Sequence, residues 1–525
     1  MNGVDTPVLI AGAGPTGLAL ALWLARLGVA FRLIDKTDNV APFSRALGVH
    51  ARTLELYQQL GFAEQVIASG LIVPSITLWA RRKKVLTVPF RNVGEGTTPF
   101  PFVLDFAQDA HERLLVSQLG EMGVVVERRT ELTAFTDDGD AIRATLRHAD
   151  GSTEECVSSY LAGCDGVHSI VREKAGARFA GGTYEHLFYV ADVDASGPTV
   201  GTGLHVDLDE ADLLAIFDMK GAGRVRLVGT VKAGAMPNGE KAIGFDDVAR
   251  RPMDQMHLQV QKVNWFSTYR VHHKVASRFR TGRTFLVGDA AHVHSPVGAQ
   301  GMNTGIGDAV NLAWKLAAVV RDGADPSLLD TYETERIAFA RRLVATTDRV
   351  FAIATKRGPA AAFARTTLFP LAASLLFRFR AVRYLLFHTV SQLGIRYPES
   401  ALSVGMAGSI RAGDRLPWVA PNGDGTAAGN FAPLASLRWQ VHIYGEAASG
   451  VRQACAELGV EYHAFAWRAA MARSGFARGA VYLVRPDGYV AFADATGGAE
   501  RLEAYVADRP WVRGDPMEDL DRVRV

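Results

Sequence analysis

The first forty residues show a regular succession of apolar runs and glycines. An apolar run at residues 8–11 breaks at Gly12, Gly14 and Gly17, and apolar residues then recur at helical spacing from 18 to 27. Gly28 follows as a typical C-terminal cap, and a second apolar run at 30–34 ends on Asp35. The pattern predicts a buried strand, a helix and a second buried strand, which together make a βαβ unit.

Strand-like patterns dominate a later block. Residues 76–79 and 85–88 read as a hairpin around the basic tip at 81–84, and most of 184–269 alternates as strands do. Helices are predicted at 54–61 and 108–119, and strands near 123–126 and 142–146. Because the long block lies between two glycine-containing segments, at 163–172 and 284–303, we expect an inserted sheet rather than a separate domain.

The last third of the chain changes character twice. Residues 304–397 read as mainly helical, and a stretch rich in Gly, Pro and Asp at 405–429 then marks a linker. Beyond it, a strand at 439–444, a helix at 451–458 and a hairpin at 480–490 outline a small α/β domain. The whole pattern predicts an α/β fold of several domains.

Composition narrows the class of protein. Of the 525 residues, 48% are hydrophobic and 21% charged, as a well-buried globular protein requires. A net charge of +2 argues against nucleic acid as a partner. The three cysteines form no CxxC pair, which fits a reducing compartment and excludes a disulfide scaffold. The first residues run directly into a strand, so we expect no signal peptide and a cytoplasmic location.

One stretch resembles a membrane segment. Residues 366–377 are uncharged, but a spanning helix needs about 20 apolar residues, and this run also contains Pro370. Arginines then alternate with aromatic and aliphatic residues from 378 to 387. Such basic amphipathic helices either pack in a protein or lie on a membrane surface. We favour packing, with no membrane as a partner, and keep the peripheral membrane surface as the alternative.

The N-terminal glycines predict a dinucleotide site. Gly12, Gly14 and Gly17 let the backbone turn tightly beside a pyrophosphate, and the helix N-terminus offers free N–H groups and positive dipole. Asp35 lies at the end of the second strand, where an acid accepts a hydrogen bond from a ribose hydroxyl. The cofactor-binding candidates here also include the neighbours Pro15, Thr16 and Lys36. The alternative is a glycine-rich turn that only packs helix on strand.

A second group of candidates follows an apolar strand at 284–287. Gly288 and Asp289 stand at its end, where a carboxylate can accept from the hydroxyls of a sugar chain. The loop from Pro296 to the expected helix start has little side-chain bulk, so its backbone can lie against a flat ring. The candidates in this loop are Pro296, Gly298, Gly301, Met302 and Asn303. A capped turn without a ligand is the alternative.

The sequence lacks the motifs that metal binding, hydrolysis or nucleotide hydrolysis would require. His292 and His294 stand two residues apart in a Gly/Pro loop without nearby acids or thiols, which makes a poor zinc set, so we expect no metal. No GxSxG elbow or Walker lysine occurs, so a hydrolase or an NTPase is not indicated. The basic tip at 81–84 is interpreted as solvated, with attraction of an anionic nicotinamide cofactor as the lesser option.

With these residues in place, the chain resembles the group A flavoprotein monooxygenases, the FAD-dependent aromatic hydroxylases. Gly12, Gly14 and Gly17 match the dinucleotide fingerprint, and Gly288-Asp289 matches the segment that holds the ribityl chain. The resemblance further places three residues near the cofactor: Arg45 at the pyrophosphate, Gln108 (with Glu112) near the ribityl-phosphate region, and Asp165, with Gly166, in a motif linked to FAD and NAD(P)H.

The resemblance implies a domain plan. It has a Rossmann-like FAD-binding domain at 1–75, 101–182 and 275–345, an inserted β-sheet substrate domain at 76–100 and 183–274, and a helical segment at 346–404. Residues 405–525 look like the thioredoxin-like C-terminal domain of some members. With Cys455 alone and no CxxC, that domain cannot carry out dithiol chemistry, so packing or a homodimer contact is expected.

The resemblance also implies the reaction. FAD would be reduced by NADPH or NADH, which binds transiently, and O₂ would then add to give a flavin C4a-hydroperoxide that hydroxylates a small phenolic or polyketide aromatic substrate. The loop around Pro296 would lie over the flavin ring, and Tyr269, His272 and His205 are candidates to bind a phenolic oxygen. For each of the three, a satisfied place in the core is the alternative.

Two departures from the family pattern bear on the substrate. Asp35-Lys36 stands where Glu-Arg is common, which keeps the acid. Leu47 stands where phenol hydroxylase carries a catalytic acid, so a phenol-type base is not carried over. The alternatives are the same flavin chemistry as epoxidation, Baeyer–Villiger oxidation or antibiotic inactivation, a flavin dehydrogenase or reductase without oxygen insertion, and an interaction protein built on an inactive flavin fold.

Overall fold

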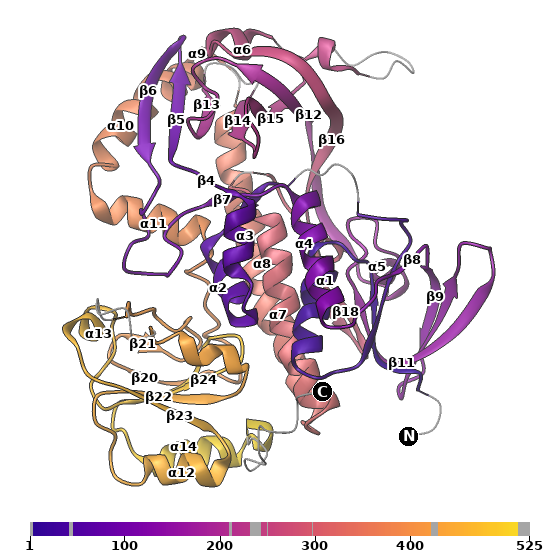
Figure 1. Ribbon diagram of the computed structural model, residues 1–525, viewed down its shortest axis with the longest axis vertical. Helices are drawn as coiled ribbons and strands as arrows, with labels where there is room; N and C mark the ends of the chain where they lie inside the picture. Colours follow the sequence, from indigo (N-terminus) through magenta and orange to yellow (C-terminus); the bar gives the residue numbers. More distant parts are fainter. Residues whose placement is uncertain are drawn as a thin grey trace.

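A computed structural model describes residues 4–40, 46–208, 213–231, 243–248, 250–296, 298–356, 358–421 and 429–512. Arg45 lies outside these residues. The described part forms separate sheets with helices packed against them (Figure 1), which confirms the expected α/β class. The strand predicted near 123–126 is wrong by a few residues, because β8 is Glu127–Arg128.

The predicted βαβ unit begins the fold. Strand β1 (Thr6–Ala11) pairs in parallel with β2 (Phe31–Asp35) and with β11 (Thr153–Gly163), and β11 pairs in parallel with β18 (Thr284–Leu286). The carboxyl ends of these strands therefore meet at one edge of the sheet. The segments that begin at Gly12, Gly163 and Gly288 follow these strands and lie at this edge, where open α/β sheets bind ligands.

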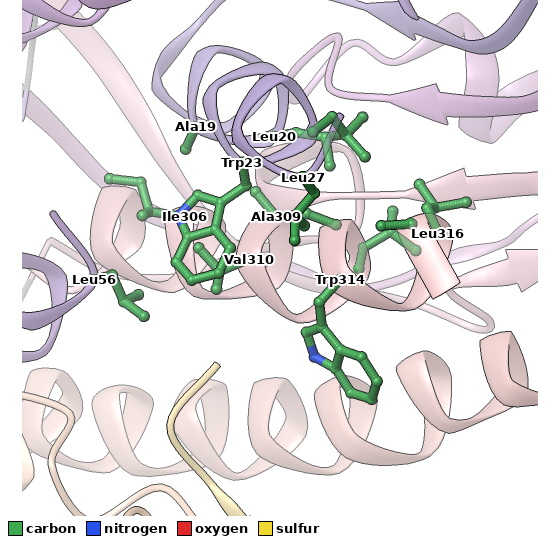
Figure 2. Packing of buried hydrophobic residues seen from close by; sticks show 14 of the residues in the cluster. Ala19, Leu20, Trp23, Leu27, Leu56, Ile306, Ala309, Val310, Trp314 and Leu316 are labelled. Atoms are coloured by element: carbon green, nitrogen blue, oxygen red, sulfur yellow. The ribbon is translucent and has the colours of Figure 1, made fainter. Parts of the chain in front are cut away.

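Helix α1 (Pro15–Arg26) is apolar on nearly all sides because it lies between layers. It packs against α4 (Gln108–Glu121) and α7 (Gly301–Val320). Figure 2 shows Trp23 of α1 against Ile306 and Val310 of α7, and Trp23 is fully buried. Burial of such a side chain stabilises the fold by about 3 kcal/mol. The contact holds the first and last glycine-containing segments in fixed register.

The inserted sheet forms as one unit from distant segments. Its order is β19-β16-β12-β15-β14-β13-β5-β6. The strands are β5 (Ser75–Ala80), β6 (Lys83–Pro89), β12 (Phe179–Ser196), β13 (Leu204–Asp207), β14 (Leu214–Asp218), β15 (Arg224–Thr230), β16 (Gln259–Ala276) and β19 (His292–Val293). A small sheet of β3 (Gly48–Val49), β7 (Leu104–Asp105) and β4 (Leu71–Ile72) lies between this sheet and the helices (Figure 1).

The helical segment differs from the expectation. It contains α8 (Asp330–Thr355), α9 (Pro359–Phe363), a π-helical turn (Ala364–Leu368), α10 (Phe369–Leu376) and α11 (Arg380–Val390). We expected the apolar run here to pack inside the protein. Instead only 17% of the window Pro359–Leu376 is buried, and by length and composition alone this window could cross a membrane. Pro370 fits because it stands in the first turn of α10, where an N–H is not needed.

The C-terminal unit has a sheet of its own, in the order β21-β20-β25-β24-β22-β23. Its elements are β20 (Val404–Ala407), β21 (Ile410–Arg411), β22 (Gln440–Tyr444), α12 (Val451–Leu458), β23 (Glu461–Phe465), α13 (Ala469–Arg473), β24 (Val481–Val484), β25 (Val490–Asp494) and α14 (Ala499–Ala507). Strands β22 and β23 run parallel, whereas β24 runs antiparallel to β22 and to β25.

Buried ion pairs join this unit to the helices. Arg485, in the turn between β24 and β25, contacts Glu335 of α8 at 2.7 Å and Asp487 at 2.6 Å. Lys315 of α7 contacts Glu335 at 3.0 Å, and Trp314 donates to Asp487 at 3.1 Å. Burial alone would raise the pKa of Glu335, but the charges of Arg485 and Lys315 hold it well below its usual range. The charges stay buried because each has an opposite charge beside it.

Candidate active site

Two of the three glycines in the turn, Gly12 and Gly17, have no space for a side chain. Gly12 has a φ of +105°, and a Cβ there would collide with the carbonyl of Cys164. A Cβ at Gly17 would collide with the carbonyl of Gly12. Gly14 instead faces open space, at the N-cap of α1, which has no side-chain cap. The turn therefore leaves the N-terminus of α1 uncovered, as anion binding requires.

Asp35 stands beside this turn. Its Oδ2 accepts from the backbone N–H of Ala13 at 2.6 Å, and its Oδ1 accepts from the N–H of Thr37 at 2.8 Å. The carboxylate thus ties the end of β2 to the glycine turn and keeps a partly exposed edge. Lys36 is exposed next to it.

Thr16 joins the first segment to the last. Its Oγ1 lies 2.5 Å from the point that a Cβ at Gly288 would occupy, and it also abuts Gly305 of α7. Gly288 has a φ of +63° and begins the 3₁₀ turn Gly288–Ala290, on which Asp289 is exposed. A Cβ at Gly12 would likewise collide with the backbone of Cys164 and Asp165. Three segments that are far apart in sequence therefore converge at one point.

Asp165 presents an unsatisfied oxygen. Its Oδ2 accepts from the N–H of Val171 at 3.1 Å, whereas its Oδ1 is buried and has no hydrogen-bond partner among the described residues. Burial raises the pKa of this carboxyl. Arg172 donates to the carbonyl of Ala290 at 3.0 Å and so fixes the segment against the Gly288 turn. A buried acceptor without a donor fits a ligand hydroxyl.

Behind the Gly288 turn lies a buried ionic group that sequence reasoning missed. Asp308 accepts from His292 Nε2 at 2.6 Å, from Arg336 Nε at 2.5 Å and from the N–H of Gly288 at 3.2 Å. Burial alone would raise the pKa of Asp308, but Arg336 and His292 hold this pKa below its ordinary value. The role of His292 is thus to position the turn. No cluster of three metal-ligating side chains occurs in the part of the chain that the structure describes.

The loop from Pro296 to Asn303 is fixed from the opposite side. Asn303 Oδ1 accepts from the N–H of His50 at 2.9 Å and from Thr53 Oγ1 at 2.7 Å, and its Nδ2 donates to the carbonyls of Gly48 and Ala299 at 2.9 and 3.0 Å. The Asn303 side chain is therefore occupied within the protein. The backbone at the start of α7, at Gly301 and Met302, is what remains on this side to face a ligand.

His50 completes this support. Its Nε2 lies 2.8 Å from the carbonyl of Gly298, and burial lowers its pKa to about 4. The ring is consequently neutral at pH 7 and donates its Nε2–H to Gly298. Gly298 (φ +80°) and Ala299 (φ +51°) both adopt left-handed backbone, which this support stabilises.

Gln108 is the first residue of α4. Its backbone N–H donates to the carbonyl of Ala46 at 3.1 Å, and its Nε2 donates to Glu112 at 2.7 Å. Burial raises the pKa of Glu112 to about 7. The helix start is thus tied to the residue that follows Arg45.

The three side chains expected to bind substrate differ in their surroundings. One ring nitrogen of His205 accepts from Trp79 Nε1 at 2.9 Å, and the other lies 2.8 Å from Thr202 Oγ1. Burial lowers the pKa of His205 to about 4. Both nitrogens are occupied, which favours the core alternative for His205. His272 contacts Thr183 Oγ1 at 2.7 Å on the sheet, and Tyr269 packs against Phe188.

A cavity of about 300 Å³ opens between the small sheet and the loops of the inserted sheet. It is lined by Asp105, Asp218, Ile72, Pro74, Gly203 and Met219, among others. Behind it, Arg226 forms a bidentate ion pair with Asp192 at 2.6 and 2.8 Å and donates to the carbonyl of Ala46 at 3.0 Å. Sequence reasoning missed Asp105, because one acid in an apolar run gives no periodic signal.

Comparison with known proteins places this site in a family. The family described as "FAD binding domain" matches residues 5–347. The 6-methylpretetramide 4-monooxygenase of Streptomyces rimosus is 38% identical, over 76% of this chain and 71% of that protein. A flavin-dependent monooxygenase of Mycobacteroides abscessus is 31% identical, over 93% of this chain and 97% of that one.

A solved structure agrees in fold over nearly the whole chain. The flavin-dependent monooxygenase PieE, in complex with FAD and substrate, superposes with a TM-score of 0.79 at 21% identity, covering 98% of this chain and 100% of that one. At this identity the likeness concerns the fold alone, and the family match and the two relatives carry the assignment. The chain belongs to the FAD-dependent aromatic monooxygenases.

Proposed function

We propose that the three converging segments hold FAD and that the enzyme uses it, with NADPH or NADH as transient electron donor, to hydroxylate a phenolic or polyketide aromatic. The observation that carries the proposal is the contact of Thr16 with Gly288, next to the unpartnered oxygen of Asp165. Bound FAD supplies redox chemistry and oxygen activation, which no side chain provides.

The residues fit the successive parts of FAD. The N-terminus of α1, with Gly12, Gly14 and Gly17, would receive the pyrophosphate, and the exposed edge of Asp35 the adenosine ribose. Asp165 Oδ1 and Asp289 would accept from hydroxyls of the sugar chain. The backbone from Pro296 to Met302 would lie against the flavin ring, supported by Asn303 and His50.

The chain's own tasks are to bind, to orient and to exclude water. Arg226, buried and paired with Asp192, holds the inserted sheet against Ala46, so the two sides of the cavity keep their spacing. Tyr269 and His272 remain candidate wall residues of the inserted sheet. The relative named for 6-methylpretetramide oxidation supports a polycyclic aromatic substrate class for this chain.

For the C-terminal unit we propose a thioredoxin-like fold with a packing role. The strand order β25-β24-β22-β23 and the helix between β22 and β23 support the fold. Cys455 is buried, and burial raises its pKa to about 12, so a reactive thiolate is not favoured there. The buried contacts of Arg485 support packing. The free cysteines also support a cytoplasmic location.

The experiment that tests the function follows oxygen. Purified protein with FAD and NADPH or NADH is supplied with ¹⁸O₂ and a panel of phenols and hydroxylated polycyclic aromatics, and products are analysed by mass spectrometry. The proposal expects one ¹⁸O atom in the product. Oxidation of the nicotinamide without label in any product would show a reductase instead.

A further inference from the structure

Asp105 is placed toward the loop that faces the proposed flavin. It is the last residue of β7 and pairs with Gly48 of β3 in an antiparallel ladder. Directly opposite residues of such a ladder point to the same face. A Cβ at Gly48 would lie 2.9 Å from the Cβ of Ala299, so that face is the one on which the 298–301 loop lies.

The Asp105 carboxyl is buried, and no described residue donates to it. The residue is only 6% exposed, lines the cavity, and its side chain makes no hydrogen bond within the described residues. Asp218, across the cavity, accepts instead from the N–H groups of Gly201 and Gly203, each at 2.7 Å. Nearby Arg226 is occupied by Asp192. Asp105 is therefore the acid of this cavity that is free to bind a ligand.

We propose that Asp105 is the catalytic base of this enzyme and receives the hydroxyl of a phenolic substrate. The proposal rests on the proposed function. The phenolic O–H bond breaks, its proton bonds to a carboxylate oxygen of Asp105, and the electron pair stays on the phenolate oxygen. The ring becomes more electron-rich and so more reactive toward electrophilic oxygen. This base compensates for the apolar Leu47, which precedes Gly48 and whose carbonyl accepts from the N–H of Phe106 at 2.8 Å.

The charge environment suits this task. Burial and the neighbouring Asp218 raise the pKa of Asp105 to about 8, although Arg226 opposes the shift. A base whose pKa lies near the working pH and near that of activated phenols shares a proton with little free-energy cost.

The test uses a phenol that changes colour on ionisation. Alizarin, a hydroxylated anthraquinone, is titrated into the FAD-loaded enzyme and its absorption recorded across pH. We expect the anion spectrum to appear at lower pH on the wild-type enzyme than in buffer, Asp105→Asn to bind alizarin in neutral form, and Asp105→Glu to restore part of the shift. The exposed Asp138→Asn is the matched control and should equal wild type.

Activity gives a second readout. With a phenolic substrate, kcat/KM should fall as pH drops through the pKa of Asp105, and Asp105→Asn should lower it about a hundredfold and flatten that limb. Three results would overturn the proposal: alizarin that stays neutral on the wild type, alizarin that does not bind at all, or an anion spectrum that Asp105→Asn leaves unchanged. The alizarin spectrum does not depend on turnover, so it tests Asp105 separately from the reaction. Failure of the wild type to take up FAD would instead overturn the proposed function.

A second, independent observation concerns the helical segment. Helices α9, α10 and α11 lie at the edge of the molecule (Figure 1), and large apolar side chains of residues 363–385 are exposed to solvent. We name this set the apolar helical face; it comprises Phe363, Leu368, Phe369, Leu371, Leu375, Leu376, Phe379, Tyr384 and Leu385. Leu371 is 64% and Leu385 65% exposed. Nine exposed large apolar side chains within 23 residues of chain mark an interaction surface.

Basic groups surround this face. A neighbouring cavity of about 520 Å³ is lined by Arg91, Arg380 and Arg383, with Glu95 as the acid on its described lining. Arg91 and Arg380 form no ion pair within the described residues. On the other side, Arg81 of the basic β5–β6 tip donates to Thr367 at 3.1 Å, which holds that tip against the π-helical turn.

We infer that the apolar helical face lies on an anionic lipid bilayer, with its leucines in the acyl region and the arginines at the headgroups. Apolar side chains rimmed by arginines are the pattern of peripheral membrane helices. A second copy of the chain fits less well, because a twofold contact through this face brings two sets of arginines together.

Vesicle sedimentation tests this surface on the full chain. Vesicles of phosphatidylcholine alone are compared with vesicles in which a third of the lipid is phosphatidylglycerol. We expect binding to the anionic vesicles that weakens with salt, about fivefold weaker in Arg380→Glu and lost in Leu371→Asp with Leu375→Asp. Val125→Asp, at an 80% exposed valine elsewhere, should bind as wild type does.

Two outcomes overturn this inference. One is the absence of binding to the anionic vesicles, or binding that the leucine and arginine substitutions leave unchanged. The other is a dimer in analytical ultracentrifugation that the leucine substitutions dissociate, which would show that a second copy covers the face.

Discussion

Thr16 and Gly288 are in contact although 272 residues separate them (288 − 16), and the Thr16 hydroxyl fills the place of a side chain at Gly288. This contact brings the N-terminus of α1 and the turn that carries Asp289 to one side of the sheet. Because α1 also packs on α7, the spacing of the segments is set by the core and does not need a ligand to form.

The first prediction concerns Gly288→Ala. The added Cβ collides with Thr16 and so moves the turn, and we expect FAD affinity to fall at least tenfold in a fluorescence titration. Gly139→Ala is the matched control, because Gly139 also has positive φ (+88°) but open space around its Cβ position. Gly139→Ala should lose only about 1 kcal/mol of stability. Equal FAD affinity in the two variants would contradict the prediction.

The second prediction concerns Asn303→Leu. The substitution removes four hydrogen bonds that fix the loop over the proposed flavin ring, so product formation per nicotinamide oxidised should fall severalfold. Asn264→Leu, which removes a single bond to Asp194 in the inserted sheet, serves as control. Coupling of nicotinamide oxidation to product is measured by chromatography. Unchanged coupling in Asn303→Leu would show that the loop does not need this support.

The third prediction concerns acid stability. Burial lowers the pKa of His50 to about 4 and those of His111 and His442 to about 3. Between these lowered pKa values and the ordinary value of about 6.5, the unfolded chain binds more protons than the folded chain. The free energy of unfolding therefore falls as pH drops through this window, by up to about 1.4 kcal/mol per pH unit for each histidine. Urea midpoints at pH 7 and pH 5 measure it.

A control separates this effect from general acid sensitivity. His168→Gln, at an exposed histidine, should leave the pH dependence of the urea midpoint unchanged. A wild-type midpoint that stays constant from pH 7 to pH 5 would mean that these histidines are not buried in neutral form.

The fourth prediction concerns the C-terminal unit. Arg485→Met leaves Glu335 and Asp487 buried with less opposite charge, so the free energy of unfolding should fall by about 3–5 kcal/mol. Arg143→Met removes only exposed ion pairs, with Asp138 and Glu155, and should leave the free energy of unfolding nearly unchanged. Calorimetry measures both. Similar losses in the two variants would mean that the buried contacts do not hold the unit in place.

The sequence predicted the parts of the site that depend on local backbone. Gly12 and Gly17 admit no side chain where strand, turn and helix meet, and such turns carry a recognisable spacing. The inserted sheet was likewise visible, because β12 and β16 are long strands of 18 residues each.

Tertiary contacts were not visible in the same way. Asp105 was missed because β3 and β7 are two-residue strands whose pairing has no sequence signal. His205 was a candidate to bind a phenolic oxygen, yet Trp79 from another strand donates a hydrogen bond to it. The apolar run at 366–377 was expected to be buried, because composition alone does not say whether a neighbouring element covers a helix.

The most direct test of the central claim is a crystal structure of the protein grown with FAD. We predict the FAD pyrophosphate at the N-terminus of α1, beside Gly14, with a sugar-chain hydroxyl within hydrogen-bond distance of Asp165 Oδ1. FAD bound elsewhere, or a pyrophosphate away from Gly14 with Asp165 Oδ1 still unpartnered, would contradict the account.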